Sequence, residues 1–137
     1  KLNGRLHLIK GNHDDRLTRN REFQQLFEEI VSYKEMSNDD KTSGIVLSHY
    51  PIPCYRNYAY GRWVHLYGHL HQSEEYEMLK GYQMQLQEKF GNKYQVLTCR
   101  MYNVGCMLPY MNYTPRTLTE ILGANERDSR WPVLECI

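Results

Sequence analysis

Three short apolar segments of this chain are each followed at once by polar residues that can bind metal ions or move protons. These residues are Asn12 and His13, then His49, and then His69 and His71. Imidazole is the commonest protein ligand for transition metals, and it changes charge near neutral pH. Because a packed sheet holds the loops at its strand ends rigidly together, we expect these five side chains to form one site.

The elements that must position these residues alternate between strands and helices. We expect strands at residues 6–9, 44–47, 63–67 and 95–104, and helices at 19–33, 73–90 and from 117 onward. This order predicts an α/β fold.

Two of the predicted helices depend on specific patterns. The apolar residues of 19–33 recur at helical spacing, namely Phe23, Leu26, Phe27, Ile30 and Val31. The polar cluster 37–43 should end that helix. Near the end of the chain, Thr117 and Glu120 match a capping box, and Gly123 should stop the helix that they begin.

Length and charge narrow the function classes. The 137 residues predict a single domain over 1–137. Seventeen basic residues oppose sixteen acidic ones, which argues against coating long nucleic acids but permits a small phosphorylated substrate. No apolar run approaches the roughly 20 residues that span a bilayer, so we expect a cytoplasmic protein with no membrane partner.

The four cysteines show no C-x-x-C spacing, so they predict neither a zinc knuckle nor a redox motif. They are Cys54, Cys99, Cys106 and Cys136. We expect free thiols that pack as small hydrophobic side chains.

Three motifs resemble the calcineurin-like metallophosphoesterase superfamily. Residues 8–14 (LIKGNHD), 47–51 (LSHYP) and 66–71 (LYGHLH) are similar to the last three motifs of that superfamily. Residues 102–105 and 112–115 also resemble the closing strand of its small bacterial and phage members. The resemblance covers nearly the whole chain, with 73–90 as a helical insertion. It implies a β-sandwich flanked by helices and a dinuclear metal centre.

The resemblance also implies a role for each polar residue. Asn12, His49 and His69 would bind one divalent ion, and His71 would bind the other. His13 would lie near the phosphate oxygens as a catalytic group. Mixed nitrogen and oxygen ligands suit manganese, iron or zinc. A hydroxide that bridges the two ions would hydrolyse a phosphate monoester or diester, and the substrate would be a small phosphorylated molecule or a nucleotide.

The first two motifs of the superfamily, Asp-x-His and Gly-Asp, do not occur before Gly11, and residues 1–10 contain no Asp. We therefore expect a chain that lacks its N-terminal strands and half of the ligands for the ion at His71. Such a chain should hydrolyse phosphate esters poorly or not at all by itself. An uncovered sheet edge should favour a homo-oligomer.

The segment 54–62 interleaves Tyr with Arg between two of the motifs. Arg56 and Arg62 could bind a phosphate in bidentate fashion, and Tyr can stack on a base. The alternative is a tyrosine-rich surface loop. We expect His7 and His65 to be structural, and Asp14 to cap the segment that follows it.

Two other classes of function compete with hydrolysis by a metallophosphoesterase. A non-catalytic scaffold could keep the fold and lose the chemistry. A metallo-β-lactamase-type hydrolase would need His-x-His-x-Asp-His, whereas Gln72, Ser73 and Glu74 follow His71. The sequence contains no His-Glu-x-x-His motif, which excludes a zincin.

Overall fold

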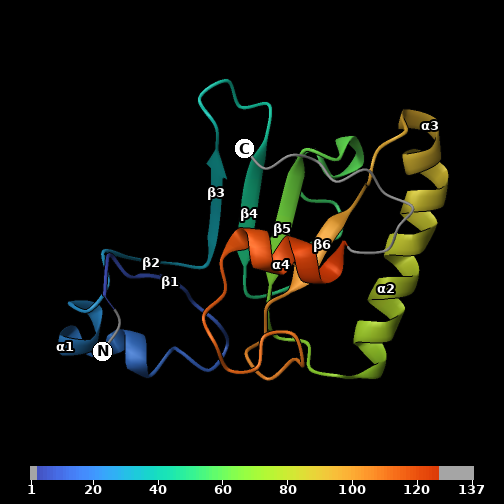
Figure 1. Ribbon diagram of the computed structural model, residues 1–137. Helices are drawn as coiled ribbons and strands as arrows, with labels where there is room; N and C mark the ends of the chain where they lie inside the picture. The colour runs from blue at the N-terminus through green and yellow to red at the C-terminus, as the bar shows by residue number, and fades with distance from the viewer. Residues whose placement is uncertain (1–2, 127–137) are drawn as a thin grey trace.

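The computed structural model describes residues 3–126, and a four-stranded sheet occupies its centre (Figure 1). Its strands are, in spatial order, β3 (Tyr33–Ser37), β4 (Gly44–Ser48), β5 (Trp63–Tyr67) and β6 (Arg100–Asn103). β3 and β4 form an antiparallel hairpin, whereas β4, β5 and β6 run parallel. The residues that follow β4, β5 and β6 therefore gather at one edge of the sheet, the lower end in Figure 1.

The predicted strands at 6–9, 44–47 and 63–67 are confirmed, with small differences at their ends. The strand predicted over 95–104 is shorter, because β6 begins only at Arg100. Gln95 and Cys99 adopt left-handed backbone conformations, with φ of 53° and 48°. An extended strand cannot pass through that conformation, so the pairing with β5 starts after Cys99.

The helix predicted over 19–33 is wrong. The structure has a 3₁₀ turn at Leu17–Arg19, a single turn α1 (Arg21–Gln24) and then the strand β2 (Glu29–Val31). β2 pairs in parallel with β1 (His7–Ile9), apart from the central sheet, and β3 follows after one residue.

Strand pairing explains why the helical spacing failed. Phe23 and Phe27 still pack together, with ring centroids 5.1 Å apart. The β-branched residues Ile30 and Val31 instead favour the extended conformation, and there they gain backbone hydrogen bonds to β1. Across this pair, Nδ1 of His7 lies 2.7 Å from Oε1 of Glu29, so His7 has a structural contact.

The later helices agree better with the sequence. Helix α2 (Glu74–Leu86) begins at Ser73, whose hydroxyl accepts from the Tyr76 N–H, and it continues through a π turn (Gln87–Gly91) into α3 (Asn92–Tyr94). The capping box of Thr117 and Glu120 is confirmed at the start of α4 (Leu118–Asn125). Gly123 lies inside α4, so it does not end this helix.

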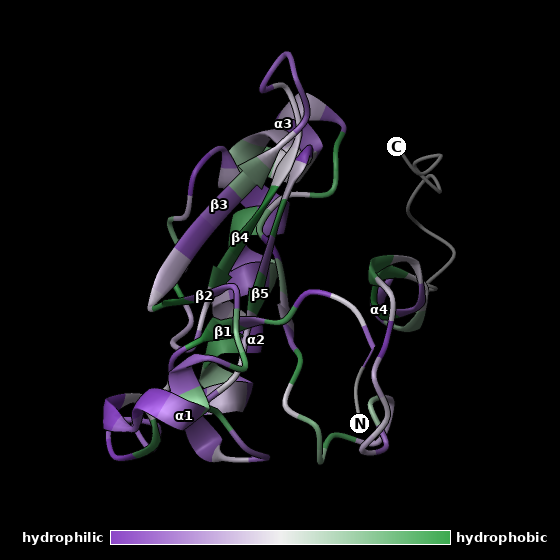
Figure 2. Ribbon diagram, turned by 90° about the vertical axis from the view of Figure 1, so that its left-hand side faces the viewer, coloured by the Kyte–Doolittle hydropathy of each residue, from purple (hydrophilic) through white to green (hydrophobic). Residues whose placement is uncertain are grey.

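Each face of the central sheet packs against one helix, and the side chains of β5 alternate between the two faces. Trp63 and Tyr67 join a core with Leu79 and Leu86 of α2. Val64 joins a second core with Ile121 of α4, which Figure 2 shows on one side of the sheet. Burial of each large side chain contributes roughly 1.5–3 kcal/mol before conformational entropy is counted.

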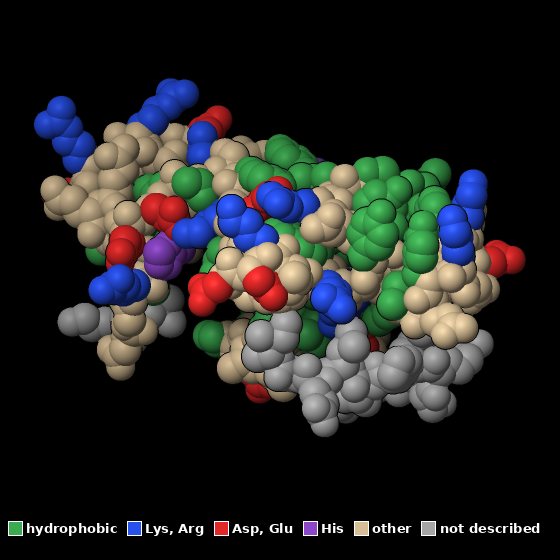
Figure 3. Space-filling view, turned by 90° about the horizontal axis from the view of Figure 1, so that it is seen from above, with side chains coloured by type: hydrophobic (Ala, Val, Ile, Leu, Met, Phe, Trp, Pro, Cys, Tyr) green, Lys and Arg blue, Asp and Glu red, His purple; other side chains and the backbone are tan. Residues whose placement is uncertain are grey.

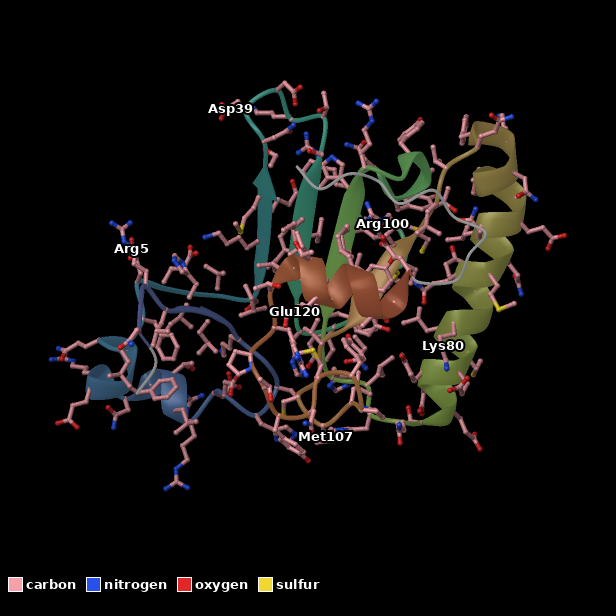
Figure 4. All side chains as sticks on the ribbon, in the orientation of Figure 1. Arg5, Asp39, Lys80, Arg100, Met107 and Glu120 are labelled. Carbon is pink, nitrogen blue, oxygen red and sulfur yellow. The ribbon has the colours of Figure 1, made fainter. Side chains whose placement is uncertain are left out.

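A buried ion pair attaches the end of α4 to β6. Nε and Nη2 of Arg100 (labelled in Figure 4) donate to the two carboxylate oxygens of Glu126 at 2.8 and 3.1 Å. The hydroxyl of Tyr102 donates to the same carboxylate. This bidentate geometry fixes the direction in which α4 crosses the sheet.

The cysteines agree only in part with the expectation of small buried groups. Cys99 is buried, but Cys54 and Cys106 are exposed, and all three are free thiols. Cys136 lies outside the described residues. Among residues 3–126, the structure contains no helix that is both long enough and apolar enough to cross a bilayer.

The start of β5 imposes one tight packing constraint. The indole ring of Trp63 lies over Gly44, its neighbour in register on β4. A Cβ at Gly44 would lie 2.8 Å from two ring carbons of Trp63 and would also collide with the carbonyl oxygen of Met36. Only glycine leaves room for the ring at this position.

We predict that Gly44→Ala lowers the free energy of unfolding by about 1–3 kcal/mol, because the added methyl overpacks a rigid contact. Gly81→Ala is the matched control, since a Cβ at Gly81 of α2 meets nothing within 4 Å. That change should stabilise the helix by roughly 0.5–1 kcal/mol. Urea denaturation of the two variants measures both effects, and equal midpoints would contradict the packing argument.

Candidate metal centre

Three of the expected residues converge at the lower edge of the sheet. Nε2 of His49 lies 2.7 Å from Oδ1 of Asn12 and 3.2 Å from Nδ1 of His69. The three residues follow β1, β4 and β5, and they are far apart in the sequence. The pairing of β4 with β5 explains the approach of His49 to His69.

The spacing of these three atoms fits a shared cation. Ligand atoms about 2.0–2.2 Å from one metal ion lie about 3 Å apart when their bonds meet at right angles. Within residues 3–126, no three His, Cys, Asp or Glu side chains form a group that could hold a metal ion. The third donor of this set is therefore the amide oxygen of Asn12, and all three donors are uncharged when the imidazoles are neutral.

The surroundings of His49 favour its neutral form. Burial lowers the pKa of His49 below its ordinary value, and the nearby His69 lowers it further. Asp14 opposes this shift, and His13 adds to it. The neutral ring donates from Nε2 to Oδ1 of Asn12 at 2.7 Å, so metal binding at Nε2 requires the other tautomer, with the proton on Nδ1.

Gly11 allows the first loop to approach His49 closely. A Cβ at Gly11 would lie 2.7 Å from Nδ1 of His49, inside the van der Waals contact distance. The Gly11 N–H donates to Oδ2 of Asp14 at 2.7 Å, which closes the turn that carries Asn12. Asp14 therefore holds this turn. The sequence predicted instead that Asp14 caps the segment that follows it, and the structure shows no such cap.

Asn103 holds the loop that carries His69. His69 has a φ of 63°, a conformation that needs support from its neighbours. The buried amide of Asn103 donates to the carbonyl oxygen of Leu70 and accepts from the Gly105 N–H at 2.9 Å. Sequence reasoning placed Asn103 only in the closing strand; its position at the end of a strand was the available signal for this role.

His65 holds the loop that carries His49. Its side chain is fully buried; Nδ1 donates to the carbonyl oxygen of Val46 at 3.0 Å and Nε2 accepts from the Ile52 N–H at 3.0 Å. These partners require the neutral ring with its proton on Nδ1. The structural role expected for His65 agrees with these contacts.

Tyr50 is part of the site, although sequence reasoning gave it no role. Its ring centroid lies 5.1 Å from that of His49 and 4.7 Å from that of His69, edge-on in both cases. Tyr50 therefore restricts both rings from one side. Its position directly after His49 was the only signal in the sequence.

His13 and His71 lie outside the group of three converging donors. His13 is exposed beside Asn12, close enough for its charge to affect the pKa of His49. Nδ1 of His71 lies 2.9 Å from Sδ of Met107, which is labelled at the lower end of Figure 4. The structure thus separates His71 from the Asn12, His49 and His69 group.

Arg56 and Arg62 lie near the opposite edge of the sheet. Arg62 directly precedes β5, and Arg56 binds Oε2 of Glu35 at 3.0 Å and packs on the ring of Trp63. The five residues of β5 span about 16 Å and lie between both arginines and the histidines. The expectation that the arginines bind a substrate held at the histidines stays a prediction.

Burial lowers the pKa of His65 below its ordinary value, which gives a testable pH dependence. The unfolded chain binds a proton at this residue below about pH 6.5, whereas the folded protein resists it. The neutral His65 therefore makes its full contribution to the free energy of unfolding above that pH, and this contribution decreases as the pH falls. We predict that His65→Gln loses less stability than the unaltered chain between about pH 7 and pH 5, measured by urea unfolding. Parallel pH profiles would contradict the prediction.

No protein-family model matches this chain, and comparisons with curated proteins and with solved structures also find no match.

Proposed function

We propose that this chain carries the metal site of a metal-dependent phosphoesterase, which hydrolyses a phosphate monoester or diester. The observation that carries the proposal is the convergence of Asn12, His49 and His69 from three separate loops, with neighbouring donor atoms 2.7 and 3.2 Å apart. The motif resemblance supports the same assignment. On this proposal the central sheet is part of a metallophosphoesterase-type sandwich.

The donor set suits the binding of an anionic substrate. Two imidazoles and one amide leave the full charge of a divalent ion available for a phosphate group, and mixed N and O ligands suit manganese, iron or zinc. When bound, such an ion supplies Lewis acidity and lowers the pKa of a bound water. His13, exposed on the same turn as Asn12, donates to the phosphate oxygens on this proposal.

The residues fit one ion better than two. Residues 3–126 provide no cluster of three His, Cys, Asp or Glu around His71, whose ring nitrogen contacts Met107. The proposal for the described part of the chain therefore covers a single ion at Asn12, His49 and His69.

Removal of a ligand should remove the metal. We predict that His69→Ala and Asn12→Ala lose bound manganese or zinc and hydrolyse nitrophenyl phosphate esters no faster than the buffer. His7→Ala is the matched control, because His7 is also exposed but contacts Glu29 in the separate β1–β2 sheet. It should keep both metal and activity. Calorimetric metal titration and absorbance assays measure the two properties.

The outcomes separate the competing functions. Full metal occupancy in His69→Ala would contradict the assignment of His69 as a metal ligand. Hydrolysis by the unaltered chain that is lost together with the metal would favour the enzyme over the scaffold. Failure of the unaltered chain to bind either metal would overturn the site itself.

His13 should behave differently from the ligands. We predict that His13→Ala keeps its metal while its turnover decreases by about 10²–10³, the usual cost of losing one donor to transition-state charge. Metal content and turnover are measured on the same sample. If metal and activity decrease together, His13 is a ligand and the proposed role is wrong.

A further inference from the structure

A cleft lies at the other end of the central sheet, where β4 and β5 begin. Its volume is about 500 Å³, within the usual range for small-molecule sites. The residues that matter to its chemistry are Lys41, Asn57, Tyr60, Arg62, Trp63 and Tyr94. They come from the β3–β4 turn, the 3₁₀ turn Tyr58–Tyr60, the start of β5 and α3. The length of β5, about 16 Å, separates this cleft from the histidines.

Two exposed tyrosine rings form one wall of the cleft. The ring centroids of Tyr60 and Tyr94 lie 5.7 Å apart, with the planes tilted by 46°. The two residues remain 58% and 40% exposed, so both rings are accessible to a ligand. Exposed aromatic rings at this spacing offer a surface on which a planar ring can stack.

Two cations stand beside the aromatic wall. Lys41 and Arg62 line the cleft, and among residues 3–126 neither forms an ion pair. Oδ1 of Asp40 accepts from the N–H and the hydroxyl of Thr42 at 2.8 and 2.6 Å. These bonds, and to a smaller extent the charge of Arg62, lower the pKa of the Asp40 carboxyl. From above this end of the sheet, Figure 3 shows basic side chains next to a broad group of hydrophobic ones.

Trp63 adds an unused hydrogen-bond donor to the lining. Its side chain is only 1% exposed, and Nε1 has no hydrogen-bond partner within the described residues. A buried donor without a partner costs free energy, so native proteins rarely keep one without a reason. Nε1 itself is closed to solvent, so a polar ligand in the cleft would reach this donor only after the side chains around it move.

We propose that this cleft binds a nucleoside monophosphate, with the base against Tyr60 and Tyr94 and the phosphate between Lys41 and Arg62. An aromatic ring that carries an anionic group uses both features of the cleft, whereas inorganic phosphate leaves the rings unused and an uncharged nucleoside leaves the cations unused. The site is distinct from the histidine group, and its occupancy does not depend on hydrolysis.

The direct test is calorimetric titration of the chain with adenosine monophosphate, in buffer with EDTA so that no metal is present at the histidines. Adenosine and inorganic phosphate are titrated separately. A second readout is the fluorescence of Trp63 in a Trp131→Phe background, because these are the two tryptophans of the chain. We expect one nucleotide per chain, a change in Trp63 emission and weaker binding of both fragments.

The variants locate the binding. Tyr94→Ala and Arg62→Ala remove exposed side chains, so they should fold normally and bind the nucleotide at least about tenfold more weakly. Lys80→Ala, which removes a half-buried cation on α2, and His69→Ala should bind it unchanged. No binding up to about 1 mM nucleotide would overturn the proposal. Equal affinity for inorganic phosphate, or loss of binding in His69→Ala, would overturn it as well.

Discussion

The parallel pairing of β4 with β5 is the constraint on which the rest of this structure depends. The register runs from Gly44 opposite Trp63 to Leu47 opposite Leu66, and it brings the residues that follow the two strands to one edge. A slip of one residue would turn every side chain of a strand to the other face. The contact of Trp63 with Gly44 opposes such a slip, because no other residue of β4 lacks a side chain.

Buried polar side chains of the sheet hold the loops at its lower end in fixed positions. His65 and Asn103 lie inside the sheet, yet each makes a hydrogen bond to a backbone group of the loop that carries His49 or His69. An unsatisfied partner in such a place costs about 1–3 kcal/mol, so these bonds restrict the loops more strongly than exposed contacts could. The side chains that are candidates for metal binding are therefore positioned by His65 and Asn103, which are not themselves candidate metal ligands.

Much of the local structure could be predicted from the sequence. The short apolar strands, the helix that follows Ser73 and the capping box at Thr117 depend on neighbouring residues only, and they form as expected. Residues 19–33 show the limit of this reasoning. Their apolar spacing suits a helix, but Ile30 and Val31 also suit a strand, and the partner that decides between them is β1.

The sequence by itself determined which residues can do chemistry, because residue type and the position after a strand are local properties. Tertiary structure decided which of them meet. Asn12 reaches His49 across 37 residues, while His71, two positions from His69, contacts Met107 instead. The aromatic cleft likewise pairs Tyr60 with Tyr94, although no pattern joins them in the sequence. Side chains from distant segments meet only where strand register and helix packing bring them, and no local pattern encodes that approach.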